Sequence, residues 1–376
     1  MAVLDITRTA TNRPNNQTGA ALMVMLVIFI IGSLALLVSA LSRAGAQNER
    51  DKVTTNALAQ AKEALIGYAT NNNIPGQLPC PEQTSLIGTA TEGSASGSCS
   101  NTVPTIGRLP WRTLGIGPLL DGNGDLLWYV LSPGFHSTPI NSDTQAKLTV
   151  DGSPNSAVAI IFSAGSPING QARTTPTNTS PPNVTQYLDL SNNDGNNTFI
   201  TNGPLATFND RLIVVTHNDL FQVVEKRVAK ELLTTFASYI SNNPNNYPNP
   251  ANINCPTTGN CNFDTAQCRG WIPTVANNNP TWVLPNWFTP NNWQQVIYYS
   301  AGSARLSNVP SGCSLLLSSA PAQALFIMAG SKLNSQIRPS SNIQDYLEDM
   351  ENYNMDDSYV KPGSTSSSND TLYVLP

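Results

Sequence analysis

The run DGNGD has the residue types and spacing of a calcium-binding loop. Asp121, Asn123 and Asp125 alternate with glycine, as the first oxygen ligands of such a loop do. The twelfth position of an EF-hand loop requires Glu, and Ser132 stands there instead. The run therefore predicts at most an irregular calcium site.

A second run, DLSNNDGNN, is rich in the same oxygen-bearing side chains. It offers Asp189, Asn192 and Asp194 as ligands. Calcium is the one cofactor that these residues suggest, and nothing in the sequence requires a cofactor. Because Asp, Asn and Gly are also the ordinary residues of turns, we favour turns as the interpretation of both runs.

Residues for catalysis are scarce. The sequence contains no GxSxG, HExxH, GxGxxG or P-loop pattern. Its two histidines are His136, expected in a turn, and His217, expected at the end of a strand; both are expected at the surface. A pair of carboxylates for glycoside hydrolysis stays open, since sequence alone cannot exclude it. We therefore expect a protein that is not an enzyme.

Six cysteines lie in the last 300 or so residues, and none forms a CxxC pair. Zinc spacing is absent, so disulfides in an oxidising compartment are the expected use. Cys80 and Cys99 flank one polar loop and are expected to pair, with a gain of about 3 kcal/mol. By analogy Cys255 would pair with Cys268, and Cys261 with Cys313, although three pairings of these four stay open.

The composition excludes one class of function. Charged residues make up only 11 % of the 376 residues, the net charge is −5 and no basic cluster exists. Binding of nucleic acid to a positive surface is therefore not expected. Four tryptophans, Trp271, Trp282, Trp287 and Trp293, gather in the C-terminal part, where they could bind a sugar or a surface. We favour their packing in or over a sheet.

An apolar run near the N-terminus predicts that the chain is attached to a membrane. Residues 20–42 contain no charge and no proline, which is long enough to cross a bilayer as a helix. Strong helix formers follow, with Val53, Leu58, Ala61, Leu65 and Tyr68 on one stripe. One helix is thus expected from about residue 20 to about residue 70, apolar in its first half and amphipathic in its second.

The rest of the chain repeats one order of landmarks. Leu109-Pro110 matches Leu284-Pro285, and Trp128-Tyr129 matches Tyr298-Tyr299. Further matches, in the same order, are Ala164-Gly165 with Ala329-Gly330, Tyr187-Leu188 with Tyr346-Leu347, and Asn209-Asp210 with Asn369-Asp370. An amphipathic helix over 220–242 opens the second copy. This order indicates the duplication of one module that contains a helix and a sheet.

The predicted fold class is α+β. Short β-branched or aromatic runs bounded by Gly, Pro, Asn or Asp predict strands. They should form two antiparallel sheets, each packed on the amphipathic face of its own helix. The expected segments are a leader (1–19), a transmembrane and assembly helix (20–72), a first globular module (73–219) and a second one (220–376).

A polar leader that ends in glycine before an apolar helix resembles the type IV pilin and pseudopilin superfamily. The segment LLDGNGDLLWYVLSPG is similar to part of the globular domain of pseudopilins. The resemblance implies that a prepilin peptidase cleaves after Gly19 and that Ala20 becomes the methylated N-terminus. Pseudopilins often bind calcium before their last strand, where Asp189 lies. One departure is Val24, which stands where the family usually has Glu at the fifth mature position.

The resemblance implies a structural function. The chain would be a minor subunit, at the tip or in the shaft, of a type IV pilus or a type II secretion pseudopilus. Its partners would be other pilin or pseudopilin subunits, the prepilin peptidase and the bacterial inner membrane, with the globular part in the periplasm and later on the filament or cell surface. The alternatives are an adhesin or binding module displayed at the tip and, with less support, a membrane-anchored periplasmic enzyme.

Overall fold

The computed structural model describes residues 18–168, 170–204, 206–276, 279–309, 311–333, 335–363 and 368–375, with only the backbone for 18–21. The chain divides into two compact units, of which the first ends at Val53 and the second comprises Thr54–Pro376. Leader residues 1–17 lie outside the described residues. The fold is α+β, with a long apolar N-terminal helix and two sheet-containing modules.

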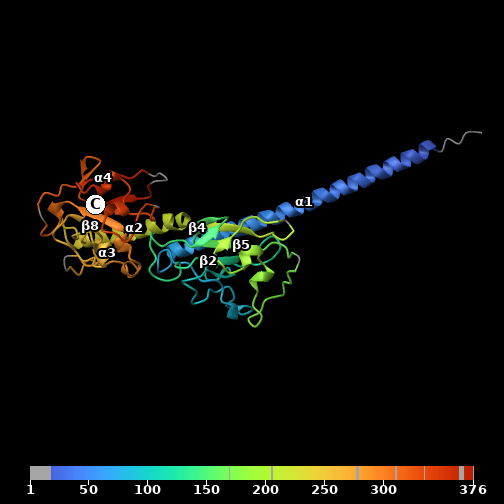
Figure 1. Cartoon of the computed structure of the whole chain (residues 1–376), viewed down its shortest axis with the longest axis horizontal. Coiled ribbons are helices and arrows are strands. Elements are labelled where there is room, and N and C mark those ends of the chain that lie inside the picture. Colours follow the sequence, from blue (N-terminus) through green and yellow to red (C-terminus); the bar gives the residue numbers. More distant parts are fainter. Residues whose placement is uncertain are drawn as a thin grey trace, which may run out of the picture. The chain divides into compact units, whose positions relative to one another are not determined.

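Helix α1 (Thr18–Asn71) is one uninterrupted element, close to the predicted bounds (Figure 1). Ala, Leu, Gln, Lys and Glu dominate its second half, and these are strong helix formers. Within the second unit its buried side chains recur every three or four residues, at Ala57, Leu58, Ala61, Leu65 and Ala69. Two residues expected on this stripe differ, since Tyr68 is only partly buried and Val53 is exposed.

We call residues 54–216 the first module and residues 217–375 the second. The first contains β1 (Thr105–Arg108), β2 (Trp128–Leu131), β3 (Leu148–Val150), β4 (Ser153–Ala157), β5 (Ala159–Ser163), β6 (Thr198–Phe199) and β7 (Arg211–Val215). The second contains α2 (His217–Asn242), α3 (Cys255–Thr258), β8 (Arg269–Trp271), β9 (Ile297–Ala301), β10 (Leu316–Leu317), β11 (Ala320–Pro321), β12 (Ala324–Met328), α4 (Met350–Tyr353), β13 (Ser358–Tyr359) and β14 (Thr371–Leu375). Short 3-10 turns connect several of these elements.

The two modules have the same strand topology. The first has an antiparallel sheet in the order β1-β2-β5-β7, and the second has β8-β9-β12-β14. Each module also has a three-stranded sheet, β4-β3-β6 or β11-β10-β13, in which one strand pair is parallel. We did not predict these small sheets, because most of their strands have only two or three residues and carry no readable periodicity. The repeat seen in the sequence is therefore also present in the strand order of the two modules.

The helix of the second module starts earlier than predicted. Thr216 and Asp219 form a capping box, in which each side chain accepts a hydrogen bond from the other's backbone N–H. This cap starts α2 at His217 rather than at residue 220. The predicted module boundary therefore falls inside α2, and His217 lies in a helix rather than at the end of a strand.

Polar contacts join α1 to α2 within the second unit. Lys62 forms an ion pair with Asp219 at 2.8 Å. The Arg227 guanidinium donates to the backbone oxygens of Thr70 and Asn72, where α1 ends. A cation at this position satisfies carbonyls that lack a helical partner and opposes the negative end of the helix dipole.

Three consecutive residues of the first module reach the second. The Asn141 amide donates to the backbone oxygen of Asn291 at 2.8 Å, and the Ser142 hydroxyl donates to Glu225 at 2.7 Å. Asp143 forms an ion pair with Arg338, also at 2.7 Å. One loop thereby ties the first module to α2 and to the segments around Asn291 and Arg338, which lie between elements of the second module.

The core is continuous across the modules. One cluster of buried side chains includes the inner face of β2, the stripe of α2 and both faces of the second sheet. A separate cluster lies between the outer face of the first sheet and the small sheet β4-β3-β6. Phe236 lies in the shared cluster, with its ring 5.0 Å from that of Trp282 and 5.1 Å from that of Tyr299.

The disulfides agree with the expectation in the first module only. Cys80 is bonded to Cys99, as expected. In the second module Cys255 pairs with Cys261 and Cys268 with Cys313, so the pairings Cys255–Cys268 and Cys261–Cys313 are wrong. The short helix α3 folds Cys255 and Cys261 back on each other, and Cys268 leads into β8 beside β9, which ends near Cys313. The analogy with the first module failed because a local helical turn pairs Cys255 with Cys261, whereas the pairing of β8 with β9 brings Cys268 near Cys313.

Truncation of Phe236 should severely destabilise the second unit. The side chain is fully buried, and Phe→Ala changes at such sites typically cost about 3–5 kcal/mol. We expect this loss for Phe236→Ala in chemical denaturation of the full chain in detergent. The matched control is Ser238→Ala, two residues along on the exposed side of α2, which should change the free energy of unfolding by less than about 0.5 kcal/mol. Equal losses for both would contradict this packing.

The disulfide pairing can be checked by peptide mapping without reduction. Cleavage before Asp264 and after Arg269 isolates Cys268 from Cys255 and Cys261. We expect the Cys268 peptide to be linked to the peptide that contains Cys313, and the Cys255–Cys261 peptide to be closed on itself. A Cys268 peptide linked to Cys255 would contradict the structure.

Candidate functional site

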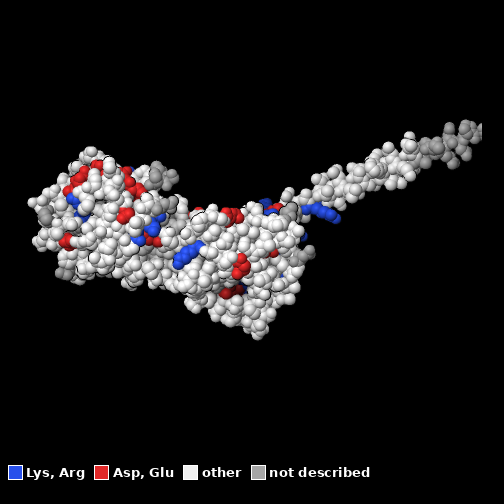
Figure 2. Space-filling view, in the orientation of Figure 1, with Lys and Arg blue, Asp and Glu red and all other residues white. Residues whose placement is uncertain are grey.

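The apolar segment of α1 is exposed over its whole described length. Its large hydrophobic side chains from Leu22 to Leu41 retain between 47 % and 78 % of their accessible surface. Among the described residues this is the one helix long and apolar enough to cross a membrane, judged by length and composition. Figure 2 shows the segment in white, without charged atoms on the face in view. So much uncovered apolar surface indicates an environment other than water.

The predicted processing residues lie where this helix begins. Gly19 and Ala20 have helical backbone in the first turn of α1, which starts at Thr18. Val24, at the fifth position after Gly19, is exposed on the same helix. The first charged side chain that follows is Arg43. Nothing charged therefore interrupts the apolar surface between Leu22 and Ser42.

Each module contains the same buried polar cluster, which we call the acid–arginine cluster. In the first module the Arg173 guanidinium lies 4.9 Å from the ring centre of Tyr187 and donates to the Gly165 backbone oxygen. Arg338, Tyr346 and Gly330 repeat this arrangement in the second module, with 4.7 Å between guanidinium and ring. Aromatic stacking and several hydrogen bonds hold each arginine in place.

Two carboxyl groups lie next to each other in each cluster. In the first module the backbone N–H of Asp189 donates to Asp210 at 2.9 Å, and the N–H of Asn209 donates to Asp189 at 2.8 Å. In the second module Glu348, Asp370 and Asn369 repeat both contacts. Burial raises the pKa of Asp210 to about 7. Burial, followed by the charge of Glu348, also raises the pKa of Asp370.

Apart from Asp189, which was a calcium candidate, these cluster residues were not among the sequence-based candidates, although a signal was present. Gln171 and Arg173 stand six and eight residues after Gly165, and Gln336 and Arg338 stand at the same distances after Gly330. Each glutamine donates to the acid of its own module, at 2.9 Å in the first and 2.7 Å in the second. The repeated Gln-x-Arg pattern could therefore have identified the clusters.

In the first calcium candidate, the side-chain oxygens of Asp121 and Asp125 bond to other groups of the protein. Asp121 accepts hydrogen bonds from the N–H groups of Asn123 and Asp125 and from the Ser163 hydroxyl. Asp125 forms an ion pair with Arg173. These contacts are those of a turn that anchors the acid–arginine cluster.

The side chains of the second calcium candidate bond to different groups of the protein. Asp189 accepts from Gln171 and Asn209, whereas Asn192 bonds Asp210 and Ile200. Asp194 is exposed and accepts from the backbone and side chain of Asn196. Cys80, Cys99 and His136 do lie within 4.8 Å of one another. Both cysteine sulfurs are used by the disulfide, so this group offers no thiolate ligand.

The tryptophans do not form an exposed platform. Trp271, Trp282 and Trp293 are buried, and Trp287 is partly buried against Trp293. The indole N–H groups of Trp271 and Trp282 donate to backbone oxygens at 2.8 Å. These tryptophans therefore pack in or against the core. The adhesin hypothesis was suggested by an exposed tryptophan surface, and the structure does not show one among these four residues.

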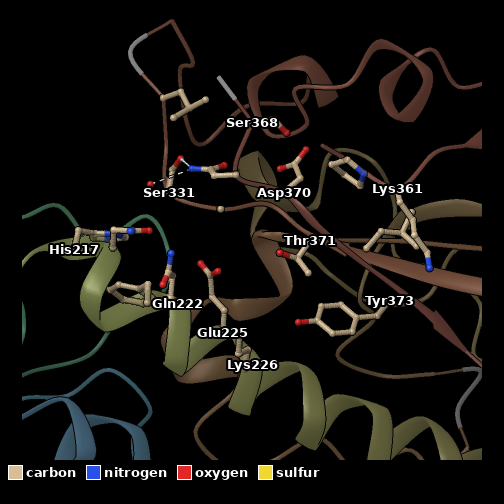
Figure 3. A pocket seen from close by; sticks show the side chains of 17 residues that line it. His217, Gln222, Glu225, Lys226, Ser331, Lys361, Ser368, Asp370, Thr371 and Tyr373 are labelled. Atoms are coloured by element: carbon tan, nitrogen blue, oxygen red, sulfur yellow. Dashed lines mark hydrogen bonds between the residues drawn. The ribbon is translucent and has the colours of Figure 1, made fainter. Parts of the chain in front are cut away.

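A pocket of about 780 Å³ lies between the first turns of α2 and the strand β14. Figure 3 shows Glu225 and Gln222 of α2 facing Thr371 and Tyr373 of β14 across it, with Asp370 and Ser331 beyond. Burial raises the pKa of Glu225 to about 7 and lowers the pKa of His217 to about 4. The His217 ring stacks on Phe221 with 4.3 Å between centres and is thus not a free surface residue.

Comparison with known proteins identifies no relative of this chain. No protein-family model matches it, and neither a curated protein nor a solved structure does so. The function is therefore argued from the residues and their geometry.

The stability of the second unit should depend on the protonation of Asp210. Its pKa rises from 3.8 to about 7 on folding, so its contribution is full below pH 4 and is lost as the pH rises towards 7. The upper limit of this loss is about 4 kcal/mol. We expect Asp210→Asn, which mimics the protonated form, to gain stability relative to the native chain between pH 4 and pH 7.

Urea denaturation of the full chain in detergent at a series of pH values measures this difference. The control is Asp194→Asn, because Asp194 is exposed in the neighbouring loop. Its stability should follow that of the native chain at every pH. Parallel curves for Asp210→Asn and the native chain would contradict the assignment of Asp210 as a protonated acid.

Proposed function

We propose that this protein is a structural subunit of a type IV pilus or a type II secretion pseudopilus. The single observation that carries the proposal is the exposed apolar half of α1, which continues without a break into an amphipathic half that packs in the second unit. One helix can thus serve first as a membrane anchor and later as a packing element between subunits. A helix that is apolar all round suits both environments.

The leader supports processing rather than simple anchoring. In the proposal a prepilin peptidase cleaves after Gly19, and Ala20 becomes the methylated N-terminus. The proposed cleavage bond would lie at the start of the apolar segment, in the first turn of α1. The part retained would then begin directly with the surface needed for assembly. The globular part would face the periplasm, an oxidising compartment in which three disulfides are stable.

Two features favour a minor subunit over the main one. Val24 offers no carboxylate to offset the charged N-terminus of a neighbour, the role of Glu in the family's main subunits. The duplicated module also doubles the volume that each subunit carries. A subunit placed once, at the tip, has no neighbour above it whose N-terminus it would have to neutralise, and it has room for a large head.

The N-terminal mass of the protein from its native membrane tests the proposal. We expect a chain that begins at N-methylated Ala20. Gly19→Arg should retain residues 1–19, because the cleavage site is altered. The matched control is Gly32→Ala in the same helix, where an added Cβ meets no atom within 4 Å; it should be processed normally. A native chain that begins at Met1 would overturn the proposal and leave α1 as a plain anchor.

A further inference from the structure

Each large sheet has one edge that the chain itself covers. Outside β8, the backbone of Ala251 forms two hydrogen bonds with that of Trp271, at 2.8 and 3.1 Å. Outside β1, the backbone N–H of Glu82 donates to the Arg108 oxygen at 2.9 Å. Covering an edge in this way prevents a further strand from pairing there. The opposite edges are formed by β7 and β14, the last strand of each module.

Strand β14 is open on its outer side. It pairs with β12 and with no other strand of the described chain. Among the described residues, no backbone hydrogen bond outside this pairing involves Thr371–Leu375. An edge strand turns about half of its N–H and C=O groups away from its partner strand. β14 thus presents backbone donors and acceptors that an added strand could use.

The pocket of about 780 Å³ runs along this edge. It is lined by five consecutive residues, 369–373, of which the last three belong to β14, whereas a pocket over one face of a strand would be lined by every second residue. The opposite wall is the part of α2 from His217 to Lys226. Both walls are about 13 Å long at the usual rise per residue of a strand and of a helix. The groove therefore fits an extended segment of about five residues.

A groove between an edge strand and a helix suits an extended peptide. The backbone of such a peptide pairs with the strand and supplies affinity, while its alternate side chains contact the walls and supply specificity. Gln222 on the α2 wall is exposed and Tyr373 on the strand wall is partly buried, so both walls offer side-chain surface. The volume also lies within the range of about 300–1,000 Å³ that is typical of ligand sites.

The charges at the rim favour an acidic segment. Lys226 and Lys361 line the groove, are exposed, and form no salt bridge within the described part of the chain. Glu225 accepts from the Ser142 hydroxyl, and Asp370 is buried. Burial raises the pKa of both carboxyl groups, to about 7 for Glu225. Below pH 7 these acids therefore do not cancel the positive charge of the two lysines.

We propose that the groove between α2 and β14 binds an extended, acidic segment of a partner protein, which adds to the second sheet as a fifth strand beside β14. The backbone of the segment would pair with the open edge of β14, and its carboxylate would lie near Lys226 or Lys361. The proposal goes beyond the assembly role of α1 and does not depend on it, because the groove lies wholly within the second unit.

Fluorescence anisotropy with a labelled pentapeptide measures this binding to the full chain in detergent at pH 6.5. The probe is fluorescein-labelled Thr-Val-Asp-Val-Thr-amide, and a second peptide has Lys in place of Asp. We expect saturable binding of the Asp peptide and binding of the Lys peptide that is at least about 3-fold weaker, because the rim charges repel it. No saturable binding of the Asp peptide, or equal binding of both peptides, would overturn the proposal.

Methylation of the peptide backbone separates strand pairing from side-chain contact. Two versions of the Asp peptide carry N-methyl groups on alternate residues, so that each version blocks one edge of the extended peptide. One of the two should bind at least about 5-fold more weakly than the parent, because it loses hydrogen bonds to β14. Binding of the parent should also slow amide hydrogen exchange in β14 but not in β7. Undiminished binding of both versions, or unchanged exchange in β14, would contradict the added strand.

Variants of α2 test the position of the groove. Gln222→Trp places bulk in the groove and should weaken binding of the Asp peptide more than 10-fold. Its matched control is Val223→Trp, at an exposed position that does not line the pocket, which should bind like the native chain. Lys226→Gln should weaken binding about 2- to 5-fold, whereas Lys230→Gln, one turn further along, should not. Thermal melts verify that all four variants fold.

Analytical ultracentrifugation of the full chain in detergent tests for a different occupant. We expect the Asp peptide to leave the sedimentation of the chain unchanged. A dimer that dissociates when the peptide is added, and that Gln222→Trp abolishes, would assign the groove to a second copy of the chain and overturn the proposal.

Discussion

Helix α2 is the element on which the arrangement of the second unit depends. Its buried stripe, which includes Val228 and Phe236, packs against the second sheet. Its first turns contact the end of α1 through Asp219 and Arg227. An antiparallel sheet is stable when its apolar face is covered by another layer. A second sheet could therefore be added only with a helix of its own, and duplication of the whole helix-and-sheet module meets this requirement.

The acid–arginine clusters show how the duplicated module was adapted. A buried arginine needs a carboxylate partner, since an unpaired buried charge is strongly destabilising. Arg173 finds its partner in Asp125, four residues before Tyr129. Four residues before the matching Tyr299 stands Gln295, and Arg338 pairs instead with Asp143 of the first module. The loss of one internal ion pair is thus linked to a contact that joins the two modules.

The sequence predicted the elements better than it predicted the sites. The bounds of α1, the stripe of α2 and the order of repeated landmarks could be derived, because periodicity and order are properties of the chain itself. The calcium loops and the tryptophan cluster were ambiguous, because turn residues and aromatic side chains have the same composition in a binding site and in a core. The structure shows Asp121 within a turn and Trp271 in the core.

What the sequence determined by itself is the long apolar-to-amphipathic helix, the α+β class and the repeat, since each follows from local pattern and composition. Only the tertiary structure decided the pairing of Cys268 with Cys313, the partner of Arg338 and the pocket beside Glu225. These depend on which residues far apart in the chain become neighbours. That choice is made by the packing of whole layers, which a local pattern does not contain.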